Sequence, residues 1–385
     1  MKIIKTENIP IKMWLDFIED GALAQAKNLA NHPSAFRHIA IMPDAHQGYG
    51  MPIGGVLAAV DAVIPNAVGV DIGCGMCAVR TSLNSIERDS LKKIIGRIRT
   101  VIPLGFNHHK TRQNPELMPL ISDNMPVSDR EYKNALTQIG TLGGGNHFIE
   151  IQKGNDGWIW IMIHSGSRNI GKQVADFYNK TAINLNEKLK HPIPKEWQLS
   201  FLPLDSHEGI SYINEMKFCV DFALANRKLM MERIKEIFTD EFRDISFNKF
   251  INIAHNYASE EKHFGKKVII HRKGATSART DETGIIPGSQ GSKSYIVSGL
   301  GNTESFMSCS HGAGRKMGRK QAERELDLDK EKERLDSLGI LHSIRGKHDL
   351  EEASGAYKDI SEVMNFQKDL VKIEIELSPL GVVKG

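Results

Sequence analysis

Short apolar segments that end in glycine-rich polar loops are the feature that most limits how this chain can fold. HIAIM is followed by PDAHQGYG and AVGV by DIGCG within residues 38–80, and WIWIMI at 158–163 ends directly on His164. Apolar runs of this length, bounded by glycine, are typical of buried strands. We therefore expect the polar loops to lie at strand ends, where the sheet holds side chains rigidly.

Helical patterns separate these strands. The spacing of apolar residues predicts helices at 85–102, 127–139 and 211–238, a charged helical stretch at 315–339, and a loop at 107–124. FINIAHNY and KVIIHRKGA are strand-like again. No linker, break in composition or repeat of fixed period divides the sequence. It therefore predicts a single composite α/β domain over residues 1–385, with central β-sheets flanked by helices.

The composition is that of a soluble globular protein, with 40% hydrophobic and 25% charged residues. No segment approaches the roughly 20 apolar residues of a membrane span, and MKIIKTENIPIKMW lacks a signal core, so we expect a cytoplasmic protein without a membrane partner. The 50 basic and 47 acidic residues nearly cancel to +3, so net charge alone does not indicate nucleic-acid binding.

Cysteine use points to metal chemistry rather than disulfides. The four cysteines, Cys74, Cys77, Cys219 and Cys309, are too few and too scattered for a disulfide framework, and no second CxxC accompanies Cys74 and Cys77 to complete a zinc knuckle. In VGVDIGCGM, Asp71 stands three residues before Cys74, after an apolar segment. A carboxylate and a thiolate at a strand end are suitable ligands for a divalent metal.

Four histidines follow apolar segments or glycines in the same way: His147, His164, His255 and His311. One such histidine alone is more often a hydrogen-bonded core residue. Four of them, together with an aspartate and a cysteine, favour a metal site. Imidazole and thiolate are borderline-soft ligands and carboxylate is a hard one, and this mixture suits Mn²⁺, Fe²⁺, Co²⁺ or Zn²⁺ better than Mg²⁺ or Ca²⁺. The thiolate of Cys74 could bridge two such ions.

Glycine and serine loops form the second unusual feature: TLGGGN, HSGSRNIGK, PGSQGSKS and SHGAGR. With Arg168, Lys172, Lys293 and Arg315 nearby, their backbone N–H groups could bind phosphate, although ordinary tight turns use glycine equally often. GSRNIGKQ matches the G-x-x-x-x-G-K of a P-loop, but Gln173 stands where Ser or Thr should bind Mg²⁺, which argues against one.

A histidine is the best candidate for a covalent nucleophile. The lysine motif KxDG of common nucleotidyl transferases is absent, since KGNDG at 153–157 has one residue too many. Neutral imidazole attacks phosphorus readily. His311 is flanked by small residues and followed by Arg315 and Arg319, which could hold phosphate oxygens.

Taken together, these motifs resemble the RtcB family of GTP-dependent RNA ligases. PDAHQGYGMPIGG, VGVDIGCGM, GGGNHFIEI, HSGSRNIG, AHNY, RKGA, PGSQGSKSY, SCSHGAGR, AYKDI and VKG carry the resemblance from about residue 10 to Gly385. The resemblance implies an enzyme that uses GTP and Mn²⁺ to join an RNA 3′-phosphate or 2′,3′-cyclic phosphate end to a 5′-hydroxyl end. It implies a covalent histidine–GMP and an RNA 3′-pp-5′-G end as intermediates, in tRNA splicing or RNA repair.

The resemblance also implies roles for individual residues. Asp71, Cys74 and His147 would hold one Mn²⁺ and Cys74, His164 and His255 a second, with His311 carrying GMP and Asp44, Arg168 and Lys273 lining the active site. The guanylate positions would be Asn146, His147, Phe148, Ile149, Glu150, Asn256, Pro287, Gly288, Ser289, Gln290, Ser294, His311, Gly312, Ala313, Gly314 and Lys384.

Two other functions fit the same motifs: a metal-dependent cyclic phosphodiesterase that processes RNA ends, and an RNA-binding protein of the same fold that does not ligate. Cys77 is expected to be a small buried residue rather than a third metal ligand. Arg315, Lys316, Arg319 and Lys320 could hold the RNA backbone, or their side chains could simply face solvent. We expect a monomer. The motifs leave open the natural RNA and any need for an archease-type activator.

Overall fold

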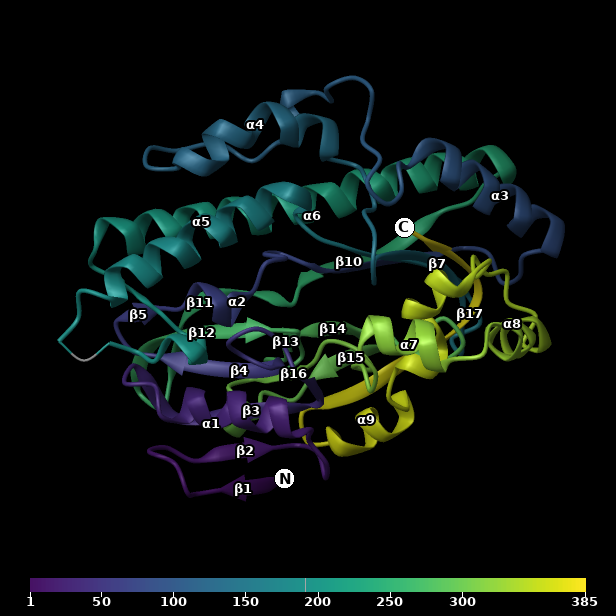
Figure 1. Cartoon of the computed structure of the whole chain (residues 1–385). Coiled ribbons are helices and arrows are strands. Elements are labelled where there is room, and N and C mark those ends of the chain that lie inside the picture. The colour runs from purple at the N-terminus through teal and green to yellow at the C-terminus, as the bar shows by residue number, and fades with distance from the viewer. Residues whose placement is uncertain (191) are drawn as a thin grey trace.

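Two large β-sheets form the frame of the protein. The computed structural model describes residues 1–190 and 192–385 (Figure 1). One sheet has six strands in the order β1-β2-β3-β4-β12-β11. Their bounds are β1 Lys2–Ile4, β2 Ile11–Met13, β3 Ala35–His46, β4 Ile53–Ala59, β11 Asn256–His263 and β12 Lys266–Lys273.

The second sheet has seven strands in the order β10-β6-β8-β7-β17-β15-β14, and every neighbouring pair is antiparallel. Their bounds are β6 Gly75–Thr81, β7 Phe148–Gly154, β8 Ile159–Ser165, β10 Phe247–Ala254, β14 Thr283–Ile286, β15 Ser294–Gly299 and β17 Val371–Lys384. Two short ribbons complete the strands, β13 (Ala275–Ser277) with β16 (Ser308–Ser310) and β5 (Ala62–Val63) with β9 (Leu202–Pro203).

Helices cover the seven-stranded sheet. The long helix α6 (His207–Glu241) contacts β6, β8 and β10, and α3, α4 and α5 pack against α6 in turn (Figure 1). The other helices are α1 Asp20–Ala30, α2 Pro65–Val68, α3 Arg88–Val101, α4 Pro126–Gln138, α5 Arg168–Asn186, α7 Arg319–Glu325, α8 Leu328–Ser337 and α9 Ile360–Phe366. Short 3₁₀ turns lie at Pro115–Leu117, Lys195–Trp197, Thr303–Ser305, Lys347–Glu352 and Ser354–Ala356. No helix in the described part of the chain is long and apolar enough to cross a membrane.

The apolar core lies in separate layers. One cluster fills the space between α3, α6 and the seven-stranded sheet, and another joins the six-stranded sheet to β14, β15 and α9. All seven residues of β8 are buried, as expected for a strand covered on both faces. Burial of this apolar surface, at about 25 cal/mol per Å², is the main force that fixes the sheets relative to the helices.

The register of the seven-stranded sheet brings the predicted ligand loops to one end. Gly75 pairs with Ser165 on one side and with Ala254 on the other, and His164 lies opposite Phe148. Cys74, His147 and His255 each directly precede or follow one of these paired residues in the sequence. The antiparallel pairing therefore places the start of β6, the start of β7, the end of β8 and the end of β10 side by side.

The α/β class expected from the sequence is confirmed, as are the helices predicted at 85–102, 127–139 and 211–238. One prediction was partly wrong: the charged stretch at 315–339 is not one helix. It forms α7 and α8, because Asp327 accepts hydrogen bonds from the backbone N–H groups of Asp329 (3.0 Å) and Lys330 (3.1 Å) and so caps a new helix.

The HSGSRNIGK segment also differs from the expected phosphate-binding loop. Helix α5 already begins at Arg168, so Gly171 and Lys172 lie inside the helix, and the Lys172 ammonium pairs with Asp176 on its surface at 2.5 Å. This geometry agrees with the argument against a P-loop.

Candidate active site and metal centre

Five side chains that could bind metal converge at the end of the seven-stranded sheet. In two groups, Cys74, His164 and His255, and Asp71, Cys74 and His147, the possible ligand atoms all lie within 4.8 Å of one another. Cys74 Sγ lies 3.3 Å from His164 Nε2 and 3.5 Å from His147 Nε2, and His147 Nε2 lies 3.1 Å from Asp71 Oδ2. Cys74 belongs to both groups, as a bridging ligand would.

The local hydrogen bonds prepare two of these histidines for ligation. The Nδ1–H of His147 donates to the Leu142 carbonyl at 3.0 Å and that of His164 to the Asn146 carbonyl at 3.1 Å. Each Nε2 therefore carries the lone pair and faces the cluster. Burial lowers the pKa of both rings, which favours the neutral form that binds metal.

The donor set fits a divalent ion. His164 Nε2 and His255 Nε2 lie only 3.4 Å apart, and His255 Nδ1 has no hydrogen-bond partner among the described residues. Burial and the neighbouring Asp71 raise the pKa of Cys74, so the thiol needs a nearby cation to ionise. Imidazole, thiolate and carboxylate together suit Mn²⁺, Fe²⁺, Co²⁺ or Zn²⁺.

His311 lies beside this cluster and is held by a buried aspartate. The Nδ1–H of His311 donates to Asp44 Oδ2 at 2.6 Å, and the backbone N–H groups of His311 and Gly312 donate to the same oxygen at 3.1 and 3.3 Å. Burial alone would raise the pKa of Asp44, but the attraction and hydrogen bond of His311 lower it overall. The carboxylate is therefore ionised, and the Nε2 of His311 is left with the lone pair.

Glycines allow this close packing. A Cβ on Gly314 (φ +72°) would lie 2.1 Å from the Asp44 carbonyl oxygen, and a Cβ on Gly274 (φ +59°) would lie 3.1 Å from the His311 ring. The His255 and His311 ring centroids are 4.8 Å apart. The imidazole of His311 is thus confined between Asp44, His255 and the turn after β12.

A cavity of about 840 Å³ opens beside His311 and shares His164 with the metal cluster. Most of the guanylate positions inferred from the sequence line it: Asn146, Phe148, Glu150, Pro287, Gly288, Ser289, Gln290, His311, Gly312, Ala313, Gly314 and Lys384. Ile149 instead packs in the apolar core, because side chains alternate along β7. Asn256 bonds to the Asp71 carbonyl and the Gly274 N–H, and Ser294 accepts a bond from Gly288 N–H.

Several backbone N–H groups of the glycine loops are already used. Gly288 N–H bonds to Ser294 at 3.2 Å, Ser289 N–H to Ser292 at 2.7 Å, and Gly312 N–H to Asp44 at 3.3 Å. These three groups are not free to bind an anion, contrary to the simplest expectation for such loops.

Cationic side chains gather around a buried carboxylate in the cavity wall. Glu352 lies 3.1 Å from Arg315, 3.5 Å from Arg319 and 3.6 Å from Lys384, and it also accepts a hydrogen bond from Tyr357. Three cations around one carboxylate leave an excess of positive charge. This excess, rather than the three backbone N–H groups already in use, is the feature of the cavity wall that would favour an anion.

Glu150 is a second buried carboxyl group in this wall. Burial raises the pKa of Glu150 to about 8, although the Gln152 side chain and Lys384 oppose that shift. N–H donors on a bound ligand would favour the ionised form of Glu150 and lower this pKa. The resulting carboxylate could then accept their hydrogen bonds.

The predicted active-site residues Arg168 and Lys273 have different surroundings. The Arg168 guanidinium lies 3.2 Å from His147 Nδ1 and packs on Gly143, next to the metal cluster. Lys273 Nζ instead donates to the carbonyls of Tyr49 and Asn66, and burial lowers the pKa of Lys273 to about 7. Lys273 is not among the cavity-lining residues in the described chain, and it links the loop at Tyr49 to helix α2.

Cys77 lies away from the cluster. Its side chain is fully buried in the apolar layer between α6 and the sheet, and its Sγ lies 3.8 Å from the Arg227 carbonyl oxygen. Lys293, in the PGSQGSKS loop, does not line the cavity either; its ammonium group pairs with Glu376 at 2.5 Å.

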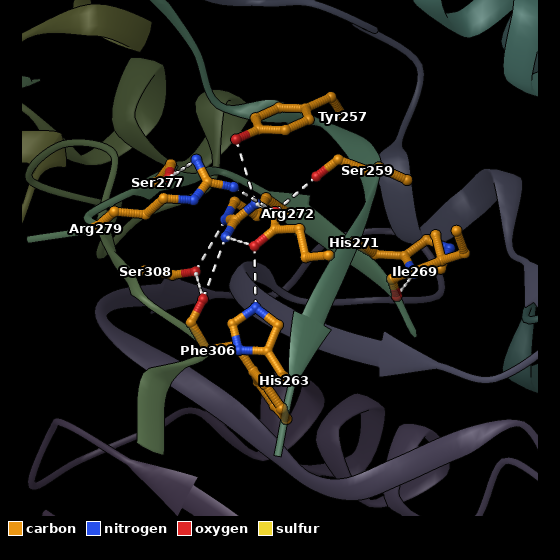
Figure 2. Close-up of polar contacts among 12 residues, drawn as sticks. Tyr257, Ser259, His263, Ile269, His271, Arg272, Ser277, Arg279, Phe306 and Ser308 are labelled. Atoms are coloured by element: carbon orange, nitrogen blue, oxygen red, sulfur yellow. Dashed lines mark hydrogen bonds and ion pairs between the residues drawn. The ribbon is translucent and has the colours of Figure 1, made fainter. Parts of the chain in front are cut away.

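The strand that leads to His311 rests on a buried ion-pair network (Figure 2). Arg272 pairs with Glu261 through its two terminal guanidinium nitrogens and also donates to Ser308 Oγ (2.9 Å) and the Phe306 carbonyl (3.2 Å). Glu261 accepts a further bond from His263 Nε2 at 3.0 Å. Phe306 has a left-handed backbone (φ 52°), and the contacts from Arg272 hold that turn immediately before β16.

Replacing Glu261 with glutamine should therefore destabilise the protein. The Arg272 side chain is fully buried, so loss of its charged partner is expected to lower the free energy of unfolding by about 3–5 kcal/mol. Glu260→Gln is a matched control on the same strand, where an exposed pair with Lys267 (3.0 Å) contributes at most about 1 kcal/mol. Urea unfolding curves of the two variants measure the difference; equal losses would contradict a structural role for the network.

Glu352, Asn226 and Arg227 are site residues that the sequence did not reveal. Glu352 lies in a 3₁₀ turn with no motif around it, and only the folded chain brings it to Arg315 and Lys384. Asn226 and Arg227 are fully buried on α6. Two adjacent polar residues within the apolar periodicity of 211–238 are the one signal that could have identified them.

Comparison with known proteins identifies the family. The family model described as tRNA-splicing ligase RtcB matches residues 25–121 and 118–385. The chain belongs to the RtcB family, as its motifs suggested.

Named relatives match this chain over most of their length. The "RNA-splicing ligase RtcB" of Escherichia coli is 36% identical over 413 residues, covering 100% of this chain and 99% of that protein. The "tRNA-splicing ligase RtcB" of Thermococcus kodakarensis is 32% identical over 466 residues, covering 100% and 96%. The "RNA-splicing ligase RtcB homolog 2" of Entamoeba dispar is 31% identical over 443 residues, covering 95% and 84%.

Proposed function

We propose that this protein is an RNA ligase that uses GTP to join an RNA 3′-phosphate end to a 5′-hydroxyl end, through a covalent GMP on His311. The observation that carries the proposal is the geometry of His311 beside the cavity. Its Nδ1–H is fixed by Asp44 at 2.6 Å, and its Nε2 is the nitrogen left to attack phosphorus. The names of the relatives support RNA ligation as the reaction.

The proposed first step is attack of His311 Nε2 on the α-phosphorus of GTP. A nitrogen–phosphorus bond forms, the bond to the bridging oxygen breaks, and pyrophosphate leaves. Asp44 stabilises the positive charge that develops on the imidazole, as the buried aspartate does for the histidine of a serine-protease triad. Two Mn²⁺ ions, held by Asp71, Cys74 and His147 and by Cys74, His164 and His255, would withdraw charge from phosphate oxygens.

The following steps transfer GMP and seal the RNA. An oxygen of the RNA 3′-phosphate attacks the GMP phosphorus, the bond to His311 breaks, and the RNA carries a 3′-pp-5′-G end. The 5′-hydroxyl then attacks the 3′-phosphorus, loses its proton, and displaces GMP. A 2′,3′-cyclic phosphate end must first be hydrolysed by water to the 3′-phosphate.

The cavity wall offers groups that complement guanine. The base presents two adjacent N–H donors and an acceptor oxygen along one edge. A carboxyl group at Glu150 can accept from the donors, and the ammonium group of Lys384, whose charge acts on Glu150, can donate to the oxygen. Adenine has a different donor pattern, so this pair favours guanine.

The RNA backbone is expected to cross the mouth of the cavity. Lys316 and Lys320 line the mouth, while Arg315 and Arg319 are also partly engaged by Glu352. Uncommitted lysines are suited to phosphate contacts, which are strongly weakened by salt.

Two assays test the proposal. Incubation with α-labelled GTP and Mn²⁺ should give a labelled protein whose label survives alkali and is lost in acid, and a stem-loop RNA with a 3′-phosphate/5′-hydroxyl break should be sealed only when GTP is present. A protein that stays unlabelled would contradict the covalent step. If the protein opened a cyclic phosphate without joining the RNA ends, this would indicate a phosphodiesterase. If it bound RNA without any reaction, this would indicate a non-catalytic role.

A further inference from the structure

Arg227 on α6 is buried beneath the metal cluster without a carboxylate partner. The side chain is fully buried, and it forms no ion pair with Asp or Glu within residues 1–190 and 192–385. Burying a charge without an opposite charge is unfavourable for folding. A contribution to stability therefore does not explain why an arginine is buried at this position.

The hydrogen bonds of Arg227 supply that explanation. Its guanidinium donates to the carbonyls of Gly73 (3.0 Å), Ser165 (2.8 Å) and Ile253 (3.2 Å), and its Nε–H donates to Asn252 (2.7 Å). Gly73 directly precedes Cys74, Ser165 directly follows His164, and Ile253 stands two residues before His255. One planar fork thus fixes the three backbone segments that carry one complete ligand group.

The packing of α6 against the first of these segments is equally close. Gly73 has φ +75°, and a Cβ there would lie 2.8 Å from Val220 Cα and 3.0 Å from the Cys219 carbonyl oxygen, both on α6. The segment is therefore pressed directly on the helix that supplies Arg227.

Asn226, the preceding residue, acts on the other ligand group. Its carboxamide oxygen accepts from the N–H groups of Gly140 (2.7 Å) and Thr141 (3.1 Å), and its NH₂ group donates to the carbonyls of Thr141 and Gly166, both at 3.2 Å. The same loop continues to Leu142, whose carbonyl fixes the ring of His147. Asn226 therefore holds the loop that orients this ligand.

We propose that Asn226 and Arg227 are positioning residues for the metal centre, Arg227 for the Cys74, His164 and His255 group and Asn226 for the loop that orients His147. The inference rests on the proposed function only in taking these side chains as metal ligands. Groups that orient ligands without touching the metal typically change its affinity by about 10–100-fold.

The test is the binding of Co²⁺ alone, followed by calorimetry and by the absorption of the cobalt–thiolate bond, in the full-length protein. Arg227→Lys keeps the charge but loses the planar fork, and it should weaken one of two binding events by about 10–100-fold and alter the thiolate absorption. Asn226→Ala should weaken binding with a different spectral change, because it loosens the other group.

Glu215→Gln is the matched control for lost stability. Glu215 is fully buried on the same helix and bonds to Val127, Ser128 and Tyr178, away from the metal cluster. It should lower the unfolding midpoint without changing Co²⁺ affinity. If Arg227→Lys does not fold, Asn252→Ala removes the acceptor of Nε–H and should cause a smaller loss of the same kind.

Each outcome separates the inference from the proposed function. A wild-type protein that binds no Co²⁺ would contradict the metal centre itself. A wild type that binds two ions, with Arg227→Lys and Asn226→Ala binding them equally tightly, would overturn the positioning role. The positioning role would also be overturned if Glu215→Gln lost as much Co²⁺ affinity as Arg227→Lys and Asn226→Ala.

Discussion

Replacing His311 with alanine is expected to abolish labelling of the protein by α-labelled GTP, with a loss of about 10⁴-fold or more. In the proposed mechanism the covalent bond forms at His311 Nε2, so without the ring there would be no acceptor for GMP. Sealing of broken RNA should be lost to the same extent. The side chain is only partly buried, at 15% exposure, and its removal should not prevent folding.

Asp44→Asn distinguishes the nucleophile from the group that orients it. An amide at this position can donate to Nδ1 of His311, which would move the proton to Nε2 and remove the attacking lone pair. We expect a loss of about 10²–10⁴-fold in labelling, with Co²⁺ binding retained in both variants. Gel autoradiography measures the labelling and calorimetry the metal.

Persistent labelling of His311→Ala, at a different residue, would show that another side chain is the nucleophile. Loss of Co²⁺ binding in that variant would mean instead that the histidine is a ligand, since its ring lies beside that of His255.

The sequence predicted well those parts of the site that depend on local patterns. Residues 159–163 are apolar at every position because β8 is covered on both faces, and the polar residue that follows them, His164, lies near the end of this strand. Cys74 and His147 precede strands in the same way. Residues at strand ends next to glycines could therefore be identified without knowing which strands are neighbours.

Contacts between distant segments could not be predicted in this way. Glu352 meets Arg315 and Lys384 only through the packing of a 3₁₀ turn against the end of β17. The early start of α5 at Arg168 was hidden because Gly166 and Gly171 suggested a loop. Arg227 lies within the helical pattern of residues 211–238, and that pattern does not show that its side chain contacts segments at three strand ends.

The two neighbouring cysteines should behave very differently. Cys74 belongs to both ligand groups, so Cys74→Ala removes a ligand from each and should abolish Co²⁺ binding by either group together with labelling by GTP. Cys77 points into the apolar core, so Cys77→Ala removes one small buried group, costs about 1 kcal/mol of stability, and should leave most labelling intact. Metal titration and labelling of the two purified variants provide the comparison.

Cys74→Ser is the control that separates ligand chemistry from side-chain size. A hydroxyl is nearly the size of the thiol but stays protonated and binds borderline-soft ions poorly. Cys74→Ser should therefore bind metal as poorly as Cys74→Ala while keeping the wild-type unfolding midpoint. Equal losses of labelling in the Cys74 and Cys77 variants would refute the assignment of the bridge. The CxxC would then act as a pair, which the burial of Cys77 in the layer between α6 and the sheet argues against.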